Sequence, residues 1–488
     1  MEQGGVSSSE LYKIFGREQL DLAQNSSLGV QLGNLVVSSI GQADDTVLIS
    51  NDIHYLFFLL QLTNIYCDKN QVQLCAEKSQ LQVFHSHKRR DDPADTANPI
   101  NIQGKSIPFT NLAEHVGILR STDSNRPTLI ARFAAHKRAL SAVLHTGLAL
   151  GHRANPMSGL QVHQLYAVPV LLSGLAALPL SSSDVDMVEK HYCETLRSLL
   201  RLLPKTPRSV VYFLAGSLPG CALVHQRQLM LFSMISRLKS DILHQHASNI
   251  YESRLISKKS WFHTIRALCV MYDLPHPSMI LQHPMEKENF KNFVKKKIIS
   301  YWERKLRSES ATLSSLSFFQ PAFMSISKPH PLWWTAGPSP SKVSMANIQA
   351  VMLSGRYRTQ SLLKHWNKNI KGNCLLSPQC HNTCEDIPHI LQHCPALSSA
   401  RERLLDFTVK YCSDLPALLK ELILRLCRPS NALFSNFLLD CSSLPDVISC
   451  VQTLGSKSLE SFFDVTRMWI YVLHRERLRR LGRWKPSW

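Results

Sequence analysis

The pattern of apolar and polar positions changes along the chain, and its first part predicts a β-hairpin followed by a helix. Two short β-prone runs, Leu35–Ile40 and Thr46–Ser50, lie on either side of the polar turn 41–45. Runs of this kind around a Gly/Asp turn are typical of a hairpin. The next apolar stretch, Ile53–Tyr66, has helical spacing and follows Asp52, which predicts a capped helix.

The remainder of the first 125 residues has a less regular pattern. Leu81 and Val83 alternate with polar neighbours, so we expect a strand over Gln80–His85. The charged stretch 87–95 predicts a loop. Residues 1–125 are therefore predicted to form a mixed α/β region.

Residues 126–310 have the apolar spacing of helices. Apolar stripes predict helices over Leu129–His145 and Val185–Leu203. A longer apolar stretch, Val210–Leu238, is interrupted by the breakers of residues 216–219, which predicts two helices instead of one. This region is predicted to be mostly helical.

The composition changes again after this helical region. Residues 311–345 are rich in Ser and Pro, which predicts a linker without long regular elements. A Cys/His-rich module follows over 346–410. The apolar spacing of Leu404–Leu426 and Leu459–Leu481 predicts helices, the second of them in a basic C-terminal region, 411–488. The whole pattern predicts an α+β protein whose β structure is small and N-terminal.

The chain of 488 residues carries a formal net charge of +19. So basic a protein usually faces phosphate, either in nucleic acid or at an anionic membrane. The hydrophobic fraction of 44% excludes a wholly disordered chain. Because the basic residues are clustered, we favour nucleic acid over a lysine-rich surface that has no specific partner.

No segment predicts a membrane span. The longest uncharged run, Ala154–Ser183, has an apolar centre at Leu165–Leu180 that is short for a bilayer and contains two prolines and a glycine. We expect a buried strand or helix there. Met1–Glu10 lacks the apolar part of a secretory leader. With 13 cysteines, the chain is expected to be intracellular, nuclear or cytoplasmic, with free thiols.

Four cysteines and three histidines lie within 21 residues, from Cys374 to Cys394. Thiolates and imidazoles are the preferred ligands of Zn²⁺, and a structural zinc site takes four of them. The residues predict a zinc site with Cys380, His389, Cys394 and either Cys374 or Cys384. The alternative is a loop of reduced cysteines with surface histidines, because the spacing is not that of standard CxxC pairs.

Asp44 and Asp45 lie in the predicted hairpin turn. Two adjacent carboxylates at an exposed turn can hold Mg²⁺, which can orient a triphosphate and a primer hydroxyl for in-line displacement. Asp-Asp pairs are also common in plain turns, so the pair alone does not indicate an enzyme. Other histidines, such as His136 and His225, are scattered and predict core or surface positions.

Three basic segments contain aromatic residues as well, a combination typical of nucleic-acid binding. Cations neutralise phosphate, and aromatic rings stack on unpaired bases. The alternative is a set of amphipathic helices whose aromatic residues pack inward. The predicted binding cations are Lys295, Lys296, Lys297, Arg356, Arg358, Arg479 and Arg480, and the aromatic residues beside them are Tyr301, Trp302, Tyr357, Trp366 and Trp484.

Several short motifs follow one another in an order that touches nearly the whole chain. They are Gln3-Gly4-Gly5, Gly29–Gly33, Ala43-Asp44-Asp45, Lys78, His115–Leu119, Pro331–Trp334, Met352–Arg358, His365-Trp366 and Glu385–Leu391 with Cys394. No single motif is unique. Their order and spacing resemble the C-terminal portion of a non-LTR (LINE-type) retrotransposon reverse transcriptase.

The resemblance implies an RNA-directed DNA polymerase that uses deoxynucleotides and Mg²⁺ and acts on RNA and DNA. It implies a partial polymerase palm over residues 1–125 and a helical thumb and connection region over 126–310. In this family the turn matching Gln3, Gly4 and Gly5 shapes the nucleotide and template site. The residues matching Asp44 and Asp45 hold the catalytic metal, and the one matching Lys78 supports the palm.

Some features depart from the family pattern. Gln42 stands where Tyr or Phe is usual, and Cys75 stands where the family has Asn. The chain begins at the Gln-Gly motif, so the family's fingers and an earlier palm strand with another metal-binding Asp are not in it. Because two-metal catalysis needs carboxylates from two strands, we expect that this polypeptide alone does not polymerise DNA.

The resemblance also bears on the Cys/His segment. It favours Cys374, Cys380, His389 and Cys394 as ligands of a closed, structural zinc site, and it makes Cys384 dispensable. A second interpretation of the whole chain is a non-catalytic nucleic-acid-binding protein that uses the zinc module and the basic helices.

Overall fold

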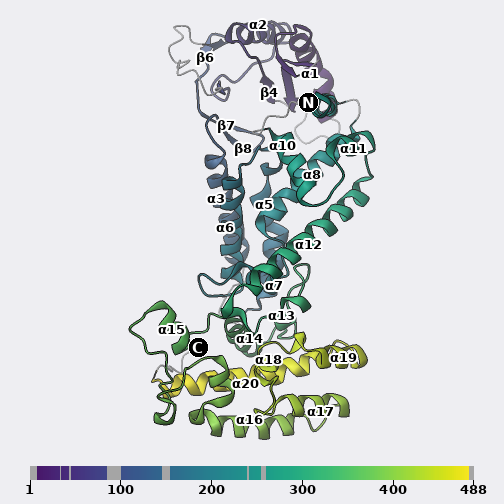
Figure 1. The fold of residues 1–488 in the computed structure, drawn as a ribbon. Helices are drawn as coiled ribbons and strands as arrows, with labels where there is room; N and C mark the ends of the chain where they lie inside the picture. Colours follow the sequence, from purple (N-terminus) through teal and green to yellow (C-terminus); the bar gives the residue numbers. More distant parts are fainter. Residues whose placement is uncertain are drawn as a thin grey trace. The chain divides into compact units, whose positions relative to one another are not determined.

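The computed structural model is mostly helical and describes residues 8–32, 35–42, 45–84, 100–145, 154–238, 241–253 and 260–482. Within these ranges the strands pair only as four separate two-stranded antiparallel hairpins (Figure 1). The chain divides into two compact units. The first comprises residues 1–132, 173–184 and 227–294, and the second comprises residues 133–172, 185–226 and 295–488.

The four hairpins all belong to the first unit. They are β1 (Val30–Leu32) with β2 (Leu35–Val37), β3 (Ser39–Gln42) with β4 (Asp45–Leu48), β5 (Asn101–Ile102) with β6 (Lys105–Ser106), and β7 (Leu112–His115) with β8 (Ile118–Ser121). The predicted hairpin is confirmed as β3 and β4, in which Gln42 opposes Asp45. The run Leu35–Ile40 contributes to two hairpins, because the chain leaves β2 at Val37 and begins β3 at Ser39.

Two helices pack beside these hairpins. α1 (Ser8–Asn25) contacts both α2 (Ile53–Lys69) and β3. The predicted cap of α2 is confirmed, since the Asp52 carboxylate accepts a hydrogen bond from the backbone N–H of His54 at 2.7 Å. Such a cap satisfies one of the unpaired donors of the first helical turn.

The predicted strand Gln80–His85 is wrong. Leu81 makes a single parallel bridge to Phe109, and residues 82–84 form no strand. Leu81 instead packs on a small core built around Leu60, Ile100 and Ile102. One partly buried apolar side chain thus holds this segment without a ladder of hydrogen bonds. The predicted loop 87–95 lies outside the described residues.

The helical prediction for residues 126–310 is confirmed. Its helices are α3 (Arg126–His145), α4 (Pro156–Val162), α5 (Val168–Leu172), α6 (Ser182–Leu199), α7 (Arg208–Ala215), α8 (Gly220–Arg237), α9 (Ile242–Ser253), α10 (Trp261–Met271), α11 (Pro277–Gln282) and α12 (Lys287–Ala311). The predicted break separates α7 from α8, where Gly216 adopts a positive φ of 61°. Its Cα lies so close to the backbone of Lys328 and Pro329 that a side chain would collide with them.

The uncharged run 154–183 is folded into short helical pieces. α4 and α5 flank the π-helical turn η2 (His163–Ala167), and the 3₁₀ turn η3 (Leu175–Ala177) follows. Among the described residues, no helix is both long and apolar enough to cross a membrane. The buried side chains Leu171, Leu172 and Leu175 explain the apolar composition of the run.

The segment 311–345 is packed, unlike the linker that its composition predicts. It contains the 3₁₀ turns η4 (Ser314–Leu316) and η5 (Pro321–Phe323), then α13 (Pro331–Trp334) and the start of α14 (Pro340–Leu353). Trp333 is fully buried, and its indole N–H donates to the carbonyl of Leu214 at 3.1 Å. Short prolyl turns are compatible with Ser/Pro-rich sequence, and the aromatic side chain anchors them.

Helix α20 (Ser458–Arg480) is the centre of the C-terminal helices. α14, α16 (Ser398–Tyr411), α18 (Phe434–Asp440) and α19 (Pro445–Leu454) all contact it, and α17 (Ala417–Leu426) contacts α19 (Figure 1). Trp469 of α20 is fully buried, and its indole N–H donates to the hydroxyl of Thr408 at 2.9 Å. The helix predicted over Leu459–Leu481 is present as α20, whereas the predicted helix Leu404–Leu426 is divided between α16 and α17 by a turn that ends at Pro416. None of the 13 cysteines, all of which lie within the described ranges, forms a disulfide.

Three histidines form a hydrogen-bonded chain in the second unit. Nδ1 of His136 lies 3.0 Å from Nε2 of His191, and Nε2 of His136 lies 3.0 Å from Nε2 of His163. Nδ1 of the fully buried His163 has no partner. Donation from His163 to His136, and from His136 to His191, leaves that nitrogen without a proton and so avoids burying an unpaired N–H.

Acid is expected to destabilise the second unit through this histidine chain. Burial, helped by neighbouring positive charge, lowers the pKa of His136 to about 4 and that of His163 to about 3. Both values are below the unfolded value of about 6.5. The free energy of unfolding is therefore at its full value above pH 6.5, where both imidazoles are neutral in the folded and the unfolded chain. It falls by about 1.4 kcal/mol per pH unit for each imidazole as the pH drops toward the pKa of the folded state.

Denaturant unfolding between pH 7 and pH 4 tests this expectation. His136→Gln should lower stability at pH 7 and reduce the slope of stability against pH. His263→Gln, which changes a histidine outside the chain of three, should leave the slope unchanged. Equal slopes in the wild type and His136→Gln would contradict the expectation.

Candidate metal centre

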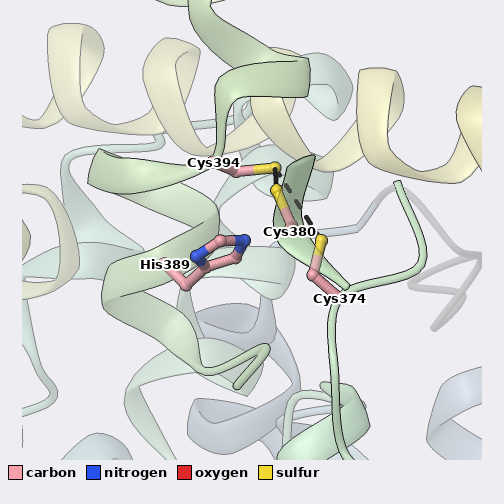
Figure 2. A group of neighbouring side chains, drawn as sticks. All are labelled: Cys374, Cys380, His389 and Cys394. Atoms are coloured by element: carbon pink, nitrogen blue, oxygen red, sulfur yellow. Dashed lines mark hydrogen bonds between the residues drawn. The ribbon is translucent and has the colours of Figure 1, made fainter. Parts of the chain in front are cut away.

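The first half of the Cys/His segment is a loop closed by backbone hydrogen bonds. The backbone N–H of Cys374 donates to the carbonyl of Thr383 at 2.9 Å, and Asn373 pairs with Cys384 as an antiparallel bridge. The turn η6 (Pro378–Cys380) begins with a proline, whose fixed φ suits the first position of a helical turn. The loop thus returns on itself and points Cys374 and Cys380 into the same space (Figure 2).

The second half is a short helical turn, as the proline before His389 predicts. The backbone N–H of His389 donates to the carboxylate of Asp386 at 2.8 Å, which caps the turn. The π-helical turn η7 (His389–His393) then ends, where the N–H of Cys394 donates to the carbonyl of His389 at 2.7 Å. These contacts place the His389 ring and the Cys394 thiol on the side that faces the loop (Figure 2).

The structure brings together Cys374, Cys380, His389 and Cys394. One ligand atom from each lies within 4.8 Å of the others, and all four residues are buried. The Cys394 sulfur is 3.9 Å from that of Cys374 and 4.0 Å from that of Cys380. Tetrahedral Zn–S bonds of about 2.3 Å place two sulfurs about 3.8 Å apart. The cluster could therefore hold a metal ion such as zinc.

Burial holds the four groups of the cluster in their neutral forms. Burial raises the pKa of the Cys374, Cys380 and Cys394 thiols and lowers that of His389. Both ring nitrogens of His389 are buried without a hydrogen-bond partner. A buried imidazole seldom lacks both partners, and a neutral imidazole beside three thiols is a donor set that binds Zn²⁺.

Cys384 is not part of the cluster. It is exposed, although its backbone pairs with Asn373 next to the first ligand. The choice that the residues left open between Cys374 and Cys384 is thus decided by the loop geometry. Cys374 points inward, and the strand-like alternation of side chains leaves Cys384 facing solvent.

A buried ion pair fastens this segment to α20. Glu385 is fully buried, and its carboxylate accepts two hydrogen bonds from Arg477, at 2.9 and 3.0 Å. It also accepts the backbone N–H of Gln360, the first residue of α15 (Gln360–Trp366), at 2.8 Å. The sequence does not indicate this contact, because Arg477 belongs to a run of arginines that is typical of an exposed surface.

Tyr357 extends the same contact. The guanidinium of Arg477 lies 5.3 Å from the centre of the Tyr357 ring. The Tyr357 hydroxyl is 2.8 Å from Nδ1 of His474. Arg477 also donates to the carbonyl of Arg358 at 3.0 Å. Tyr357 and Trp302, both predicted to stack on bases, are buried and pack inward.

The predicted binding cations differ in exposure and pairing. Lys295, Lys296 and Arg358 are exposed, whereas Lys297 and Arg356 are half-buried. Arg479 and Arg480 both pair with Glu476, at 2.7 and 2.9 Å. Hydrogen bonding from Arg479, together with Arg480, lowers the pKa of the Glu476 carboxyl to about 2. These two arginines therefore offer less net charge than their sequence indicates.

The predicted catalytic residues lie on the hairpins and turns of the first unit. Asp45 begins β4 and is exposed, and Lys78 is exposed in a turn. Asp44 and the nucleotide-site residues Gln3, Gly4 and Gly5 lie outside the described residues. Over the described ranges, no group of three or more His, Cys, Asp or Glu side chains gathers around Asp45.

The comparisons with known proteins leave the family open. No protein-family model matches the chain. A search of curated proteins finds no match either. The case for the metal centre therefore rests on the geometry of its four residues.

Metal content should follow this geometry. Purified protein is expected to contain about one zinc per chain. Cys384→Ser should leave the zinc content unchanged, because that thiol faces solvent. Cys380→Ser should lower it strongly and destabilise the C-terminal region. Elemental analysis and thermal unfolding measure the two effects. Zinc that is lost in Cys384→Ser but kept in Cys380→Ser would overturn the ligand assignment.

Proposed function

We propose that this protein binds nucleic acid through a basic surface on α12. The observation that carries the proposal is a set of exposed cations on one helix, Lys295, Lys296 and Arg304. An open depression of about 550 Å³ lies along the same helix. It is lined by Lys296, Ile299, Ser300, Glu303, Arg304 and Arg307. Cations held along a rigid helix suit the regular charges of a phosphate backbone.

The acidic residues of α12 support this proposal because they are already paired. Glu303 accepts hydrogen bonds from Arg307 at 3.3 Å and from Ser325 at 2.8 Å. Glu309 pairs with Arg208, and Glu288 pairs with Lys291. Over the part of the chain that the structure describes, no ion pair engages Lys295, Lys296 or Arg304. Their charge is therefore available to an anionic ligand.

We further propose that the chain is related to LINE-type reverse transcriptases. The order of the motifs supports this, and the β3–β4 hairpin has the form that the acidic turn of that family requires. Asp45 and its neighbour Asp44 would then hold the Mg²⁺ that orients deoxynucleotide and primer, with Lys78 in support. The Cys/His cluster would hold structural Zn²⁺.

Polymerase activity is not expected of this polypeptide alone. Two-metal phosphoryl transfer needs carboxylates from more than one strand, and Asp45 has no such cluster around it in the described ranges. Primer extension on an RNA template with Mg²⁺ and deoxynucleotides should give no product above background. Extension that disappears in Asp44→Ala would contradict this expectation and establish an enzyme.

The binding surface on α12 is tested by its salt dependence. Log Kd against log salt concentration should be steep for the wild type, because phosphate contacts release counterions. In a variant with both Lys295→Gln and Lys296→Gln, the slope should fall by about 2, one for each lost contact.

The control for this test is Lys291→Gln, which removes a lysine of the same helix that already pairs with Glu288 at 3.0 Å. It should change the slope by less than one unit. A slope that is flat in the wild type, or that falls equally in the control, would refute the proposed surface.

A further inference from the structure

One tryptophan differs from the others in its environment. Trp302, Trp333 and Trp469 are buried, whereas Trp366 exposes 52% of its surface. Among the described residues it is the only tryptophan that is mostly exposed. About half of this large aromatic side chain is therefore accessible to a binding partner.

The position of Trp366 in the fold explains its exposure. It is the last residue of α15, and the backbone leaves the helix at Asn367 in an extended conformation. The N-terminal end of the helix is buried, since Gln360 is buried and donates its N–H to Glu385. The helix thus begins in the core and ends in solvent. Its buried first residue fixes the position of the exposed last turn.

Three lysines lie within five residues of Trp366 in the sequence. Lys364, Lys368 and Lys371 are all exposed, and the stretch 364–371 contains no acidic residue. Gly372 adopts a positive φ of 83°, and a Cβ there would lie 2.9 Å from Cδ of Lys364. The aliphatic stem of Lys364 therefore lies over the glycine, which limits the positions of its ammonium group.

The chemistry of this surface favours an unpaired nucleic-acid strand over a membrane. The other exposed side chains of the stretch 364–371, His365, Asn367 and Asn369, are polar, unlike the apolar face with which an interfacial helix inserts into lipid. An aromatic ring can stack on an unpaired base, and nearby cations can neutralise the phosphates on either side of that base. A base in a duplex is already stacked and offers its face only after extrusion.

We propose that Trp366 is a stacking platform, flanked by Lys364, Lys368 and Lys371, that makes this protein prefer single-stranded nucleic acid to duplex. The inference rests on the proposed nucleic-acid binding and deepens it. The cations on α12 attract any phosphate backbone. The exposed ring adds affinity only where a base is free to stack.

Fluorescence anisotropy with the 488-residue protein tests this. The probes are a 15-nucleotide oligouridine strand and a 15-base-pair RNA duplex at the same salt concentration. Trp366→Ala should weaken binding of the single strand by about 5- to 150-fold, the range expected for loss of one stacked base. It should change duplex binding by less than about twofold, and Trp366→Phe should keep most of the affinity.

A matched control removes another exposed aromatic ring of the same unit. Tyr166 is 59% exposed on η2, and Tyr166→Ala should leave binding to both probes unchanged. A loss of single-strand affinity equal to that of Trp366→Ala would overturn the proposal, as would an equal loss for both probes in Trp366→Ala.

The two proposals fail in different ways. If the wild type binds neither probe, the proposed function is refuted together with this inference, and the same holds if it binds only anionic vesicles. If the wild type binds RNA with a steep salt dependence but Trp366→Ala binds the single strand as tightly as the wild type, only the stacking platform is refuted.

Discussion

The buried ion pair between Glu385 and Arg477 is the contact on which the C-terminal region depends. Both charged groups are withdrawn from water, so each requires the other, and loss of one partner from such a pair costs about 3–5 kcal/mol. Arg477 belongs to α20, around which the neighbouring helices pack. Glu385 lies between Cys380 and His389, two residues of the Cys/His cluster. The pair therefore ties the cluster to the helical core.

This contact also connects the candidate metal centre to Trp366, the proposed stacking platform. The same carboxylate accepts the first backbone N–H of α15, and α15 ends at Trp366. A metal ion would hold the loop on one side of Glu385, while Arg477 holds it on the other. The exposed ring would then be positioned through a rigid backbone, without any direct contact with the metal.

Local features of the sequence predict local structure well here, and long-range packing poorly. The Asp52 cap and the β3–β4 hairpin follow from adjacent residues, and both were predicted. The direction in which Tyr357 and Trp302 point depends on helices distant in the sequence, so amphipathic spacing alone could not place them. The cluster of Cys374 with Cys394 was predicted because its residues are close in sequence. The ion pair between Glu385 and Arg477 joins residues that are far apart in the sequence, and it was not predicted.

The separation between these two kinds of contact has a consequence for the order in which the protein folds on the ribosome. All four residues of the Cys/His cluster lie between positions 374 and 394, so they can meet as soon as that stretch emerges. Arg477 follows Glu385 by 92 residues, which takes about 5–20 s to synthesise. During that interval the Glu385 carboxylate can accept the N–H of Gln360 but lacks its guanidinium partner. Metal binding by the Cys/His cluster can thus precede the packing of α20 against it. The nascent chain would then contain a closed loop before Arg477 is synthesised.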